Sequence, residues 1–299
     1  MTLYSQISAN VQKTWAWIFV FFCLILGFGW AISAIYHSPD IFILAVAVAI
    51  SQVWISYFFS DKISLAMTGA RKVEFKESQE LYRLVENLCI AAGLPTPEIY
   101  IIADNQPNAF ATGRDPKHSS IALTSGLFNS LEKNEIEAVV SHELAHIQNR
   151  DTFLQAVMLT LVGVISLAAD IFWRAGFRRS RQDDVEGSNG PIFFILGIIF
   201  VIVAPILGKL MQLAVSRQRE FLADASGSMI TRNPEALASA LEKISQYDFS
   251  MRRSSPATEH LFIASPLRGE EAMGFVSKLF STHPPIEERI KELRRMNIQ

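Results

Sequence analysis

The stretch His142-Glu143-Leu144-Ala145-His146 is the most informative part of this chain. Two histidines four positions apart lie on one face of a helix, separated by about 6 Å along its axis. Two imidazole nitrogens can then reach one Zn²⁺ at about 2.0–2.1 Å, and Glu143 is placed to take a proton from a water at that ion. The alternative is an amphipathic helix with two buried, hydrogen-bonded histidines. With only 6 histidines in 299 residues, chance rarely produces this spacing.

The overall composition indicates a chain with both membrane and water-facing parts. The hydrophobic fraction of 50% and the mean hydropathy of +0.24 are too high for an ordinary soluble domain. The charged fraction of 19% is nevertheless too high for a bundle made only of membrane helices. A net charge of −2 gives no reason to expect nucleic acid as a partner.

Two uncharged stretches near the N-terminus predict a transmembrane hairpin. Residues 15–36 exceed the ~20 residues that cross a bilayer core, and residues 41–59 come close to that length after a short polar break. A signal peptide is the alternative for the first stretch, but the apolar part of a signal peptide usually has only about 7–15 residues. We therefore assign residues 1–60 to an N-terminal transmembrane hairpin.

Two later apolar stretches, residues 152–169 and 192–208, are near the minimum length for a span. Each either crosses the membrane or covers the water-facing domain. We expect both to be embedded in the membrane, and we assign residues 152–215 to two membrane-associated helices. They separate two parts of the water-facing domain, residues 61–151 and 216–299.

Local patterns predict the elements of those two parts. The first part has helical periodicity over residues 77–92, followed by three short strands, over residues 98–103, 109–113 and 120–124. Asn134 is expected to cap the next helix, with Glu137 as its capping-box partner, and that helix carries the two histidines. Patterns in the second part predict three helices, over residues 216–230, 234–247 and 286–296, and a loop-rich stretch over residues 250–281.

A catalytic zinc site needs a third protein ligand, and Glu220 is the best candidate. Glu220 and Asp224 share a helix face, so Glu220 can bind the metal while Asp224 accepts the free N–H of a ligating histidine. The alternative is that Glu220 only pairs with Arg217 on a solvated face. The other histidines without partners at ligand spacing are expected on the surface or in loops: His37, His118 and His260.

Three motifs together resemble one protein family. They are His142-Glu143-x-x-His146, Glu220-x-x-x-Asp224 and His283-Pro284-Pro285-x-x-x-Arg289. Their order and setting are similar to those of the HtpX family of membrane zinc metalloproteases, which are relatives of the CAAX prenyl endopeptidases. The resemblance extends over essentially the whole chain.

This resemblance implies a fold and a metal site. The fold would be α+β, mostly α-helical, with transmembrane helices and a zincin-type metalloprotease domain that contains a small β-sheet. His142, His146 and Glu220 would bind one Zn²⁺ per subunit, and Glu143 would be the general base.

The resemblance also suggests roles for residues other than the zinc ligands and the general base. His283 would lie near the metal and donate to the oxyanion of the tetrahedral intermediate; alternatively, the histidine belongs to a rigid turn before the last helix. Arg289 would brace His283 or an acidic neighbour, or be an exposed helix charge. Asn108, Ala109 and Phe110 resemble the family's edge strand, to which substrate adds as a further strand; an ordinary interior strand is the alternative.

The distribution of basic residues predicts the orientation in the membrane. Four follow the second apolar stretch: Lys62, Arg71, Lys72 and Lys76. Residues 37–40 contain no lysine or arginine, so the catalytic domain is predicted to be cytoplasmic in a multi-pass protein of the bacterial inner membrane. Four arginines lie between the two later apolar stretches, and they would be outside the cell if both stretches crossed the membrane, which disagrees with this orientation: Arg174, Arg178, Arg179 and Arg181. The alternative is therefore that the two later stretches form a shallow hairpin that does not cross the membrane.

These observations favour a membrane-embedded zinc endopeptidase that cleaves membrane or misfolded proteins at the cytoplasmic face, in membrane protein quality control. Its partners would be protein or peptide substrates and the lipid bilayer, and the sequence leaves the oligomeric state open. A CAAX-type peptidase of lipidated peptides is one alternative, but it needs a cavity walled by more membrane helices. A non-catalytic metal-binding membrane adaptor is another, and Glu143 argues against it because metal ligation alone does not need that carboxylate.

Overall fold

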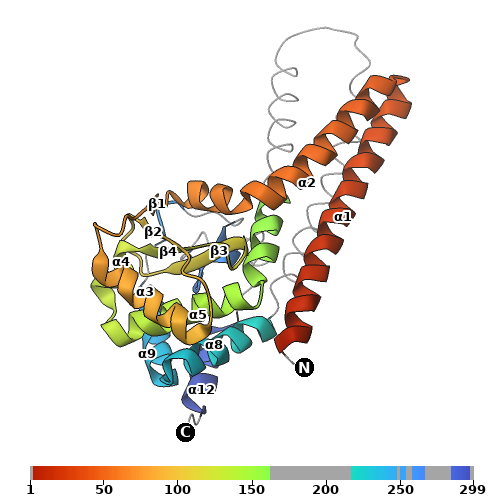
Figure 1. The fold of residues 1–299 in the computed structure, drawn as a ribbon. Helices are drawn as coiled ribbons and strands as arrows, with labels where there is room; N and C mark the ends of the chain where they lie inside the picture. The colour runs from red at the N-terminus through yellow and green to blue at the C-terminus, as the bar shows by residue number, and fades with distance from the viewer. Residues whose placement is uncertain (1–2, 162–216, 248–249, 254–257, 267–283, 297–299) are drawn as a thin grey trace.

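Two long helices, α1 (Leu3–Tyr36) and α2 (Pro39–Thr68), form a hairpin that projects from a unit of sheet and shorter helices (Figure 1). The computed structural model describes residues 3–161, 217–247, 250–253, 258–266 and 284–296. Each long helix contains a stretch long and apolar enough to cross a membrane, which confirms the predicted pair of segments. Gly29 of α1 lies directly against Ala45 of α2, so the absence of a side chain there permits close packing of the hairpin.

The second helix of the hairpin does not end at the expected boundary near residue 60. It continues without a break to Thr68, and Gly69 then ends it in the left-handed conformation with a φ of 69°. Gly69 suits this position because it has no Cβ to oppose a positive φ. The membrane hairpin is thus joined to the rest of the fold by a continuous helix.

Within the described residues, the sheet contains four strands in the order β1-β2-β4-β3. The three longer strands confirm those predicted: β2 (Glu98–Ile102), β3 (Ala109–Asp115) and β4 (His118–Thr124). β1 (Arg71–Lys72) has only two residues, too few for a recognisable alternation. β4 runs parallel to β2 and antiparallel to β3, so β3 forms one edge of the sheet.

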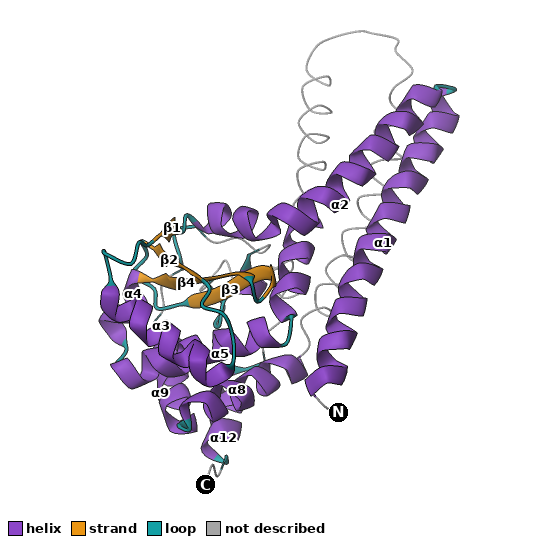
Figure 2. Cartoon of the chain, viewed as in Figure 1, coloured by secondary structure: helices purple, strands orange, loops and turns teal. Residues whose placement is uncertain are grey.

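Helices cover one face of this sheet (Figure 2). They are α3 (Gln79–Ala92), α5 (Lys133–Gln148), α8 (Arg217–Thr231), α9 (Pro234–Ser245) and α12 (Ile286–Arg294), with the short helix α4 (Ser125–Ser130) beside them. The short helix η1 (Glu259–Leu261) lies on the other face of the sheet, where Leu261 packs with Phe110 and Leu65. α5 lies against β3 and β4, and both α8 and α9 pack on α5. Fully buried side chains such as Ile121, Val139 and Leu144 fill the core between these layers, and each stabilises the fold by about 1.5–3 kcal/mol. The metal-site helix is therefore held from both sides.

The helices predicted over residues 77–92, 216–230, 234–247 and 286–296, and the helix that carries the two histidines, are confirmed, but the predicted cap of α5 is wrong. Glu132, not Asn134, is the N-cap, and its backbone N–H donates to Glu135 at 2.8 Å. Glu135 is buried, and it also accepts hydrogen bonds from Ser239 (2.6 Å) and Lys243 (2.8 Å) of α9. These tertiary bonds fix Glu135 at the third helical position, so the helix begins before Asn134.

A further helix, Asp151–Leu161, follows α5 and is buried along its length. Phe153, Leu154 and Val157 pack against Ile18 and Phe21 of α1. Only this first part of the predicted apolar helix over residues 152–169 lies within the described residues. The stretch over residues 192–208 lies outside them.

Candidate metal centre

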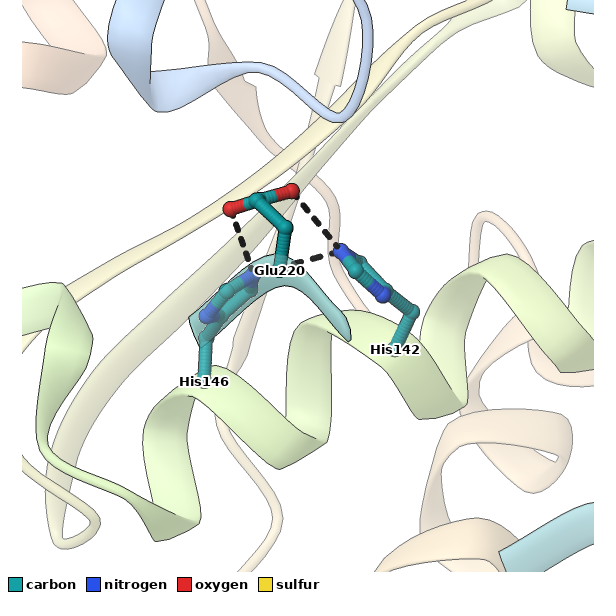
Figure 3. A group of neighbouring side chains, drawn as sticks. All are labelled: His142, His146 and Glu220. Carbon is teal, nitrogen blue, oxygen red and sulfur yellow. Dashed lines mark hydrogen bonds and ion pairs between the residues drawn. The ribbon is translucent and has the colours of Figure 1, made fainter. Parts of the chain in front are cut away.

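Helix α5 presents His142 and His146 on the face that meets α8 (Figure 3). Their Nε2 atoms are 3.2 Å apart, and both side chains are buried. Glu220 of α8 reaches across, with one carboxylate oxygen 3.6 Å from the Nε2 of His146 and the other 3.9 Å from the Nε2 of His142. Three side chains from two helices therefore direct their donor atoms toward one point.

The spacing of these donors fits a zinc ion. Two ligands at ~2.05 Å from a tetrahedral ion are separated by roughly 3.3 Å. The separations here are 3.2 Å between the two Nε2 atoms and 3.6 and 3.9 Å from these atoms to the two Glu220 oxygens. Two imidazoles and one carboxylate also form a common donor set of catalytic zinc sites. Of the predicted residues, the structure thus brings His142, His146 and Glu220 together as a possible metal-binding group.

Gly227 explains how α8 comes so close to α5. A Cβ at Gly227 would stand 2.8 Å from the backbone nitrogen and 2.9 Å from the Cα of His142. Real side chains do not tolerate such contacts, so only glycine allows this approach of the two helices. Because Gly227 and Glu220 are on the same helix, the close contact also fixes the height of the Glu220 carboxylate above the histidines.

Behind His142, the Asp224 carboxylate is held by Arg289. Asp224 Oδ1 lies 2.9 Å from the Nδ1 of His142. Arg289 of α12, fully buried, donates to both Asp224 oxygens at 2.9 and 2.7 Å and to the carbonyl of Ile263 at 2.8 Å. Burial opposes ionisation of Asp224, but the Arg289 charge and these hydrogen bonds lower its carboxyl pKa. Arg289 is therefore placed against an acidic neighbour and not on the exposed side of its helix.

His146 has a matching carboxylate, Asp151, which the sequence reasoning missed. Asp151 Oδ2 lies 3.0 Å from the Nδ1 of His146, and Arg219 donates to the other oxygen at 3.2 Å. Burial alone would lower the pKa of His146, but the Asp151 hydrogen bond and the charges of Glu220, Asp151 and Glu143 raise it to about 9. Asp151 follows the end of α5, so no helical spacing connects it to His146.

Glu143 lies beside the possible metal-binding group and is almost fully buried. Burial raises the pKa of its carboxyl group, although the positive character of His142 and His146 and a hydrogen bond from the Ala111 N–H oppose that rise. A carboxylate with a raised pKa accepts protons more readily at neutral pH than an exposed one. The geometry and the environment both suit proton transfer at this position.

Comparison with known proteins places this arrangement in a family. Residues 76–297 match Peptidase family M48. The chain belongs to peptidase family M48. A protein named Protease HtpX homolog from Thermoanaerobacter pseudethanolicus is 42% identical over 302 residues, covering 99% of each chain. Another with that name from Tropheryma whipplei (strain Twist) is 41% identical over 297 residues, also covering 99% of each.

The fold also resembles that of a solved structure. The crystal structure of S. mikatae Ste24p aligns with a TM-score of 0.51 at 19% identity, covering 97% of this chain and 67% of that chain. The resemblance to the HtpX family, expected from the motifs, is confirmed, and the M48 chain is a metalloprotease. Family membership sets aside the non-catalytic adaptor, and the two long apolar helices agree with a membrane protease.

The predicted substrate-binding segment, Asn108 to Phe110, lies at the start of the edge strand β3. Asn108 is fully buried, and its side chain donates to the carbonyl of Ala264 at 2.9 Å. The carbonyl of Ala109 accepts from the Ile263 N–H at 2.9 Å, and Phe110 pairs with β4. The outward backbone groups at this end of β3 thus already have partners within the chain.

Of the remaining histidines that the structure describes, His37 and His118 are exposed as expected, and His260 is not. His283 lies outside the described residues. His37 is exposed in the turn between α1 and α2, and His118 is exposed on β4, where its Nδ1 lies 2.9 Å from Asp115. His260 is an exception to the predicted surface placement: it is buried in η1, with Nε2 3.1 Å from the carbonyl of Gln155. Its burial depends on packing against the helix Asp151–Leu161, which local sequence does not reveal.

Proposed function

We propose that this protein is a zinc-dependent endopeptidase that cleaves membrane or misfolded proteins at the cytoplasmic face of the bacterial inner membrane. The observation that carries the proposal is the convergence of His142, His146 and Glu220 around one point, with Glu143 beside them. The family supplies the reaction class, and the donor set and its spacing favour zinc as the metal.

Within this proposal, each residue of the site has a separate task. Zinc, when bound, supplies a Lewis acid that polarises the scissile carbonyl and makes water more acidic. Glu143 takes the proton from the attacking water and delivers it to the leaving amine. Asp224 and Asp151 orient His142 and His146 through their Nδ1 atoms, so that both Nε2 atoms face the same point.

We place the substrate strand further along β3 than Asn108–Phe110. Backbone groups alternate in direction along a strand, so Ala109, Ala111 and Gly113 face away from β4. Ala109 is engaged by Ile263, and the Gly113 carbonyl accepts from Thr152 at 2.9 Å. The Ala111 carbonyl and the Gly113 N–H are the groups we assign to a substrate backbone. Ala111 also contacts Glu143, so a peptide bound there would lie beside the general base.

The catalytic part of the proposal is tested with substitutions in the full-length protein in detergent. Glu143→Gln should retain about one zinc per chain and lose cleavage of a fluorogenic casein. Glu220→Ala should lose the zinc itself, as measured by metal analysis. Glu137→Gln is the matched control, since it makes the same chemical change on the same helix without a described contact to the site. Cleavage by the Glu143→Gln protein at the wild-type rate would overturn the mechanism.

The cytoplasmic orientation is tested by labelling cysteines in intact cells. Cys23→Ser removes the exposed native thiol, whereas Cys89 is buried. In that background, a cysteine replacing exposed His37 should react with a membrane-impermeant maleimide, and one replacing exposed Lys76 should react only after lysis. The reverse pattern would place the catalytic domain on the outer face and refute this part of the proposal.

A further inference from the structure

The N-terminal end of α1 reaches the metal centre through one buried amide. Asn10 is 5% exposed, and its side-chain nitrogen donates to the Asn149 carbonyl at 2.9 Å and to Asp151 Oδ1 at 2.7 Å. Figure 1 shows this end of α1 beside the end of α8. A residue at the beginning of a candidate membrane helix thus contacts the carboxylate behind a metal-site histidine.

The two acceptors of Asn10 flank a sharp turn of the backbone. Helix α5 ends at Gln148, and Arg150 then adopts the left-handed conformation with a φ of 61°. This conformation is unfavourable for a side chain as large as arginine and persists only where the surroundings fix it. By binding Asn149 on one side and Asp151 on the other, Asn10 holds the turn that sends the chain from α5 into the next helix.

This backbone turn also sets the position of Asp151 relative to His146. Asp151 is 1% exposed, and its second oxygen lies 3.0 Å from the Nδ1 of His146. A carboxylate in this place fixes the tautomer and the ring orientation of a metal-binding histidine. Arg219 holds Asp151 from α8 and Asn10 holds it from α1, so two separate elements define one carboxylate.

We infer that Asn10 is a positioning residue for the metal centre, through which docking of the N-terminal hairpin orients His146. The inference rests on the proposed zinc site. Its consequence is that the site is complete only when α1 is in place. A chain whose hairpin is displaced would keep all three ligands and still hold zinc less tightly.

The test is a comparison of zinc affinity among variants of the full-length protein in detergent, by competition with a chromophoric chelator. Asn10→Leu keeps the approximate side-chain size but removes the donor, and it should weaken zinc binding about 3–10-fold. Asp151→Ala, which removes the contacting carboxylate itself, should weaken binding about 10–100-fold. The double variant should be no weaker than Asp151→Ala alone, because Asn10 acts through Asp151.

Thr14→Val is the matched control. Thr14 is fully buried on the same helix, one turn from Asn10, and its hydroxyl donates only to the Asn10 carbonyl within the described structure. Its replacement perturbs the packing of α1 without touching Asp151 and should leave zinc affinity unchanged. The visible absorption spectrum of the cobalt-substituted protein should change in Asn10→Leu and not in Thr14→Val, since it reports ligand geometry.

The outcomes separate this inference from the proposed function. A wild-type protein that binds no zinc would overturn the proposed function and this inference with it. A zinc-binding wild type with an unchanged Asn10→Leu variant would overturn the inference alone. Equal losses in Asn10→Leu and Thr14→Val would also overturn it, because they would indicate a general effect of hairpin packing.

Discussion

Replacing Gly227 with alanine would test whether the spacing between α5 and α8 sets the metal site. The new Cβ would stand 2.8 Å from the backbone nitrogen of His142 and 3.0 Å from the carbonyl carbon of Ser141. Both are backbone atoms in a buried helix, so no side chain can rotate away. Reaching ordinary contact at 3.4 Å requires the helices to separate by about 0.6 Å.

This separation should affect stability and metal binding to different degrees. Overpacking costs about 1–3 kcal/mol, whereas alanine in a helix gains about 0.8–1 kcal/mol over glycine. The net loss of about 0–2 kcal/mol leaves the protein folded. Zinc ligands tolerate displacements of only about 0.2 Å, so moving Glu220 away from the histidines should weaken zinc binding at least about 10-fold.

Chelator competition would measure the zinc affinity of Gly227→Ala, and thermal unfolding would measure its stability. Ser228→Ala is the matched control: Ser228 is buried next to Gly227, and its hydroxyl has no hydrogen-bond partner among the described residues. The control should bind zinc like the wild type. If Gly227→Ala also binds zinc with wild-type affinity, the reasoning that helix spacing governs the site is refuted.

Three further changes probe other parts of the structure. Arg289→Met leaves the Asp224 charge buried without its partner and should cost about 3–5 kcal/mol in a denaturant titration; an unchanged midpoint would contradict the buried pair. Burial raises the pKa of the Cys89 thiol to about 12, so with the other cysteine replaced, Ellman's reagent at pH 8 should react only after unfolding, and rapid reaction of the native protein would disprove burial. Burial alone would raise the pKa of Glu135, but hydrogen bonds, chiefly from Lys243, lower it. Its contribution is therefore present above the unfolded pKa of about 4.3 and is lost as the pH falls through the folded value. Glu135→Gln should cost about 0.5–1 kcal/mol at pH 7, and a difference that stays constant down to pH 3 would count against this linkage.

The residues of the possible metal-binding group could be predicted from sequence because helical spacing converts directly into geometry. His142 and His146, like Glu220 and Asp224, are four residues apart and therefore share a helix face. The strands and most helices were predictable for a similar reason, since their apolar periodicity is local. The convergence of the two helices was not contained in either spacing, and its placement depends on Gly227.

The elements that could not be predicted depend on contacts between distant parts of the chain. Asp151 is out of helical register with His146, and its contact with Asn10 joins residues 141 positions apart. The cap of α5 was misplaced for the same reason. Asn134 is the better cap by residue type, but bonds from α9 to Glu135 fix the start of the helix at an earlier position. Tertiary packing overrode the local preference.

The charges behind the two histidines form matched chains. Each Nδ1 faces a carboxylate, and each carboxylate is paired with a guanidinium from another element. The chains are His142, Asp224 and Arg289 on one side, and His146, Asp151 and Arg219 on the other. Within each chain the carboxylate and the guanidinium cancel, so the orientation of the histidine is fixed without adding net charge to a buried site.

Arg289 also lies 3.5 Å from a carboxylate oxygen of Glu220, so its charge is shared between Asp224 and Glu220. Glu143 and Glu220 nevertheless bring the carboxylates of the described site to four against two guanidiniums, a balance of two negative charges. A divalent cation matches two negative charges, and burial makes the match important because uncompensated buried charges cost several kcal/mol each. The carboxylates of Glu220 and Glu143 lie in different places. Glu220 faces the Nε2 atoms of both histidines, and Glu143 lies beside the edge strand β3. This balance also explains why a neutral amide suits position 10. A lysine or arginine there would also be a donor to Asp151, but it would add a positive charge beside a site suited to a cation.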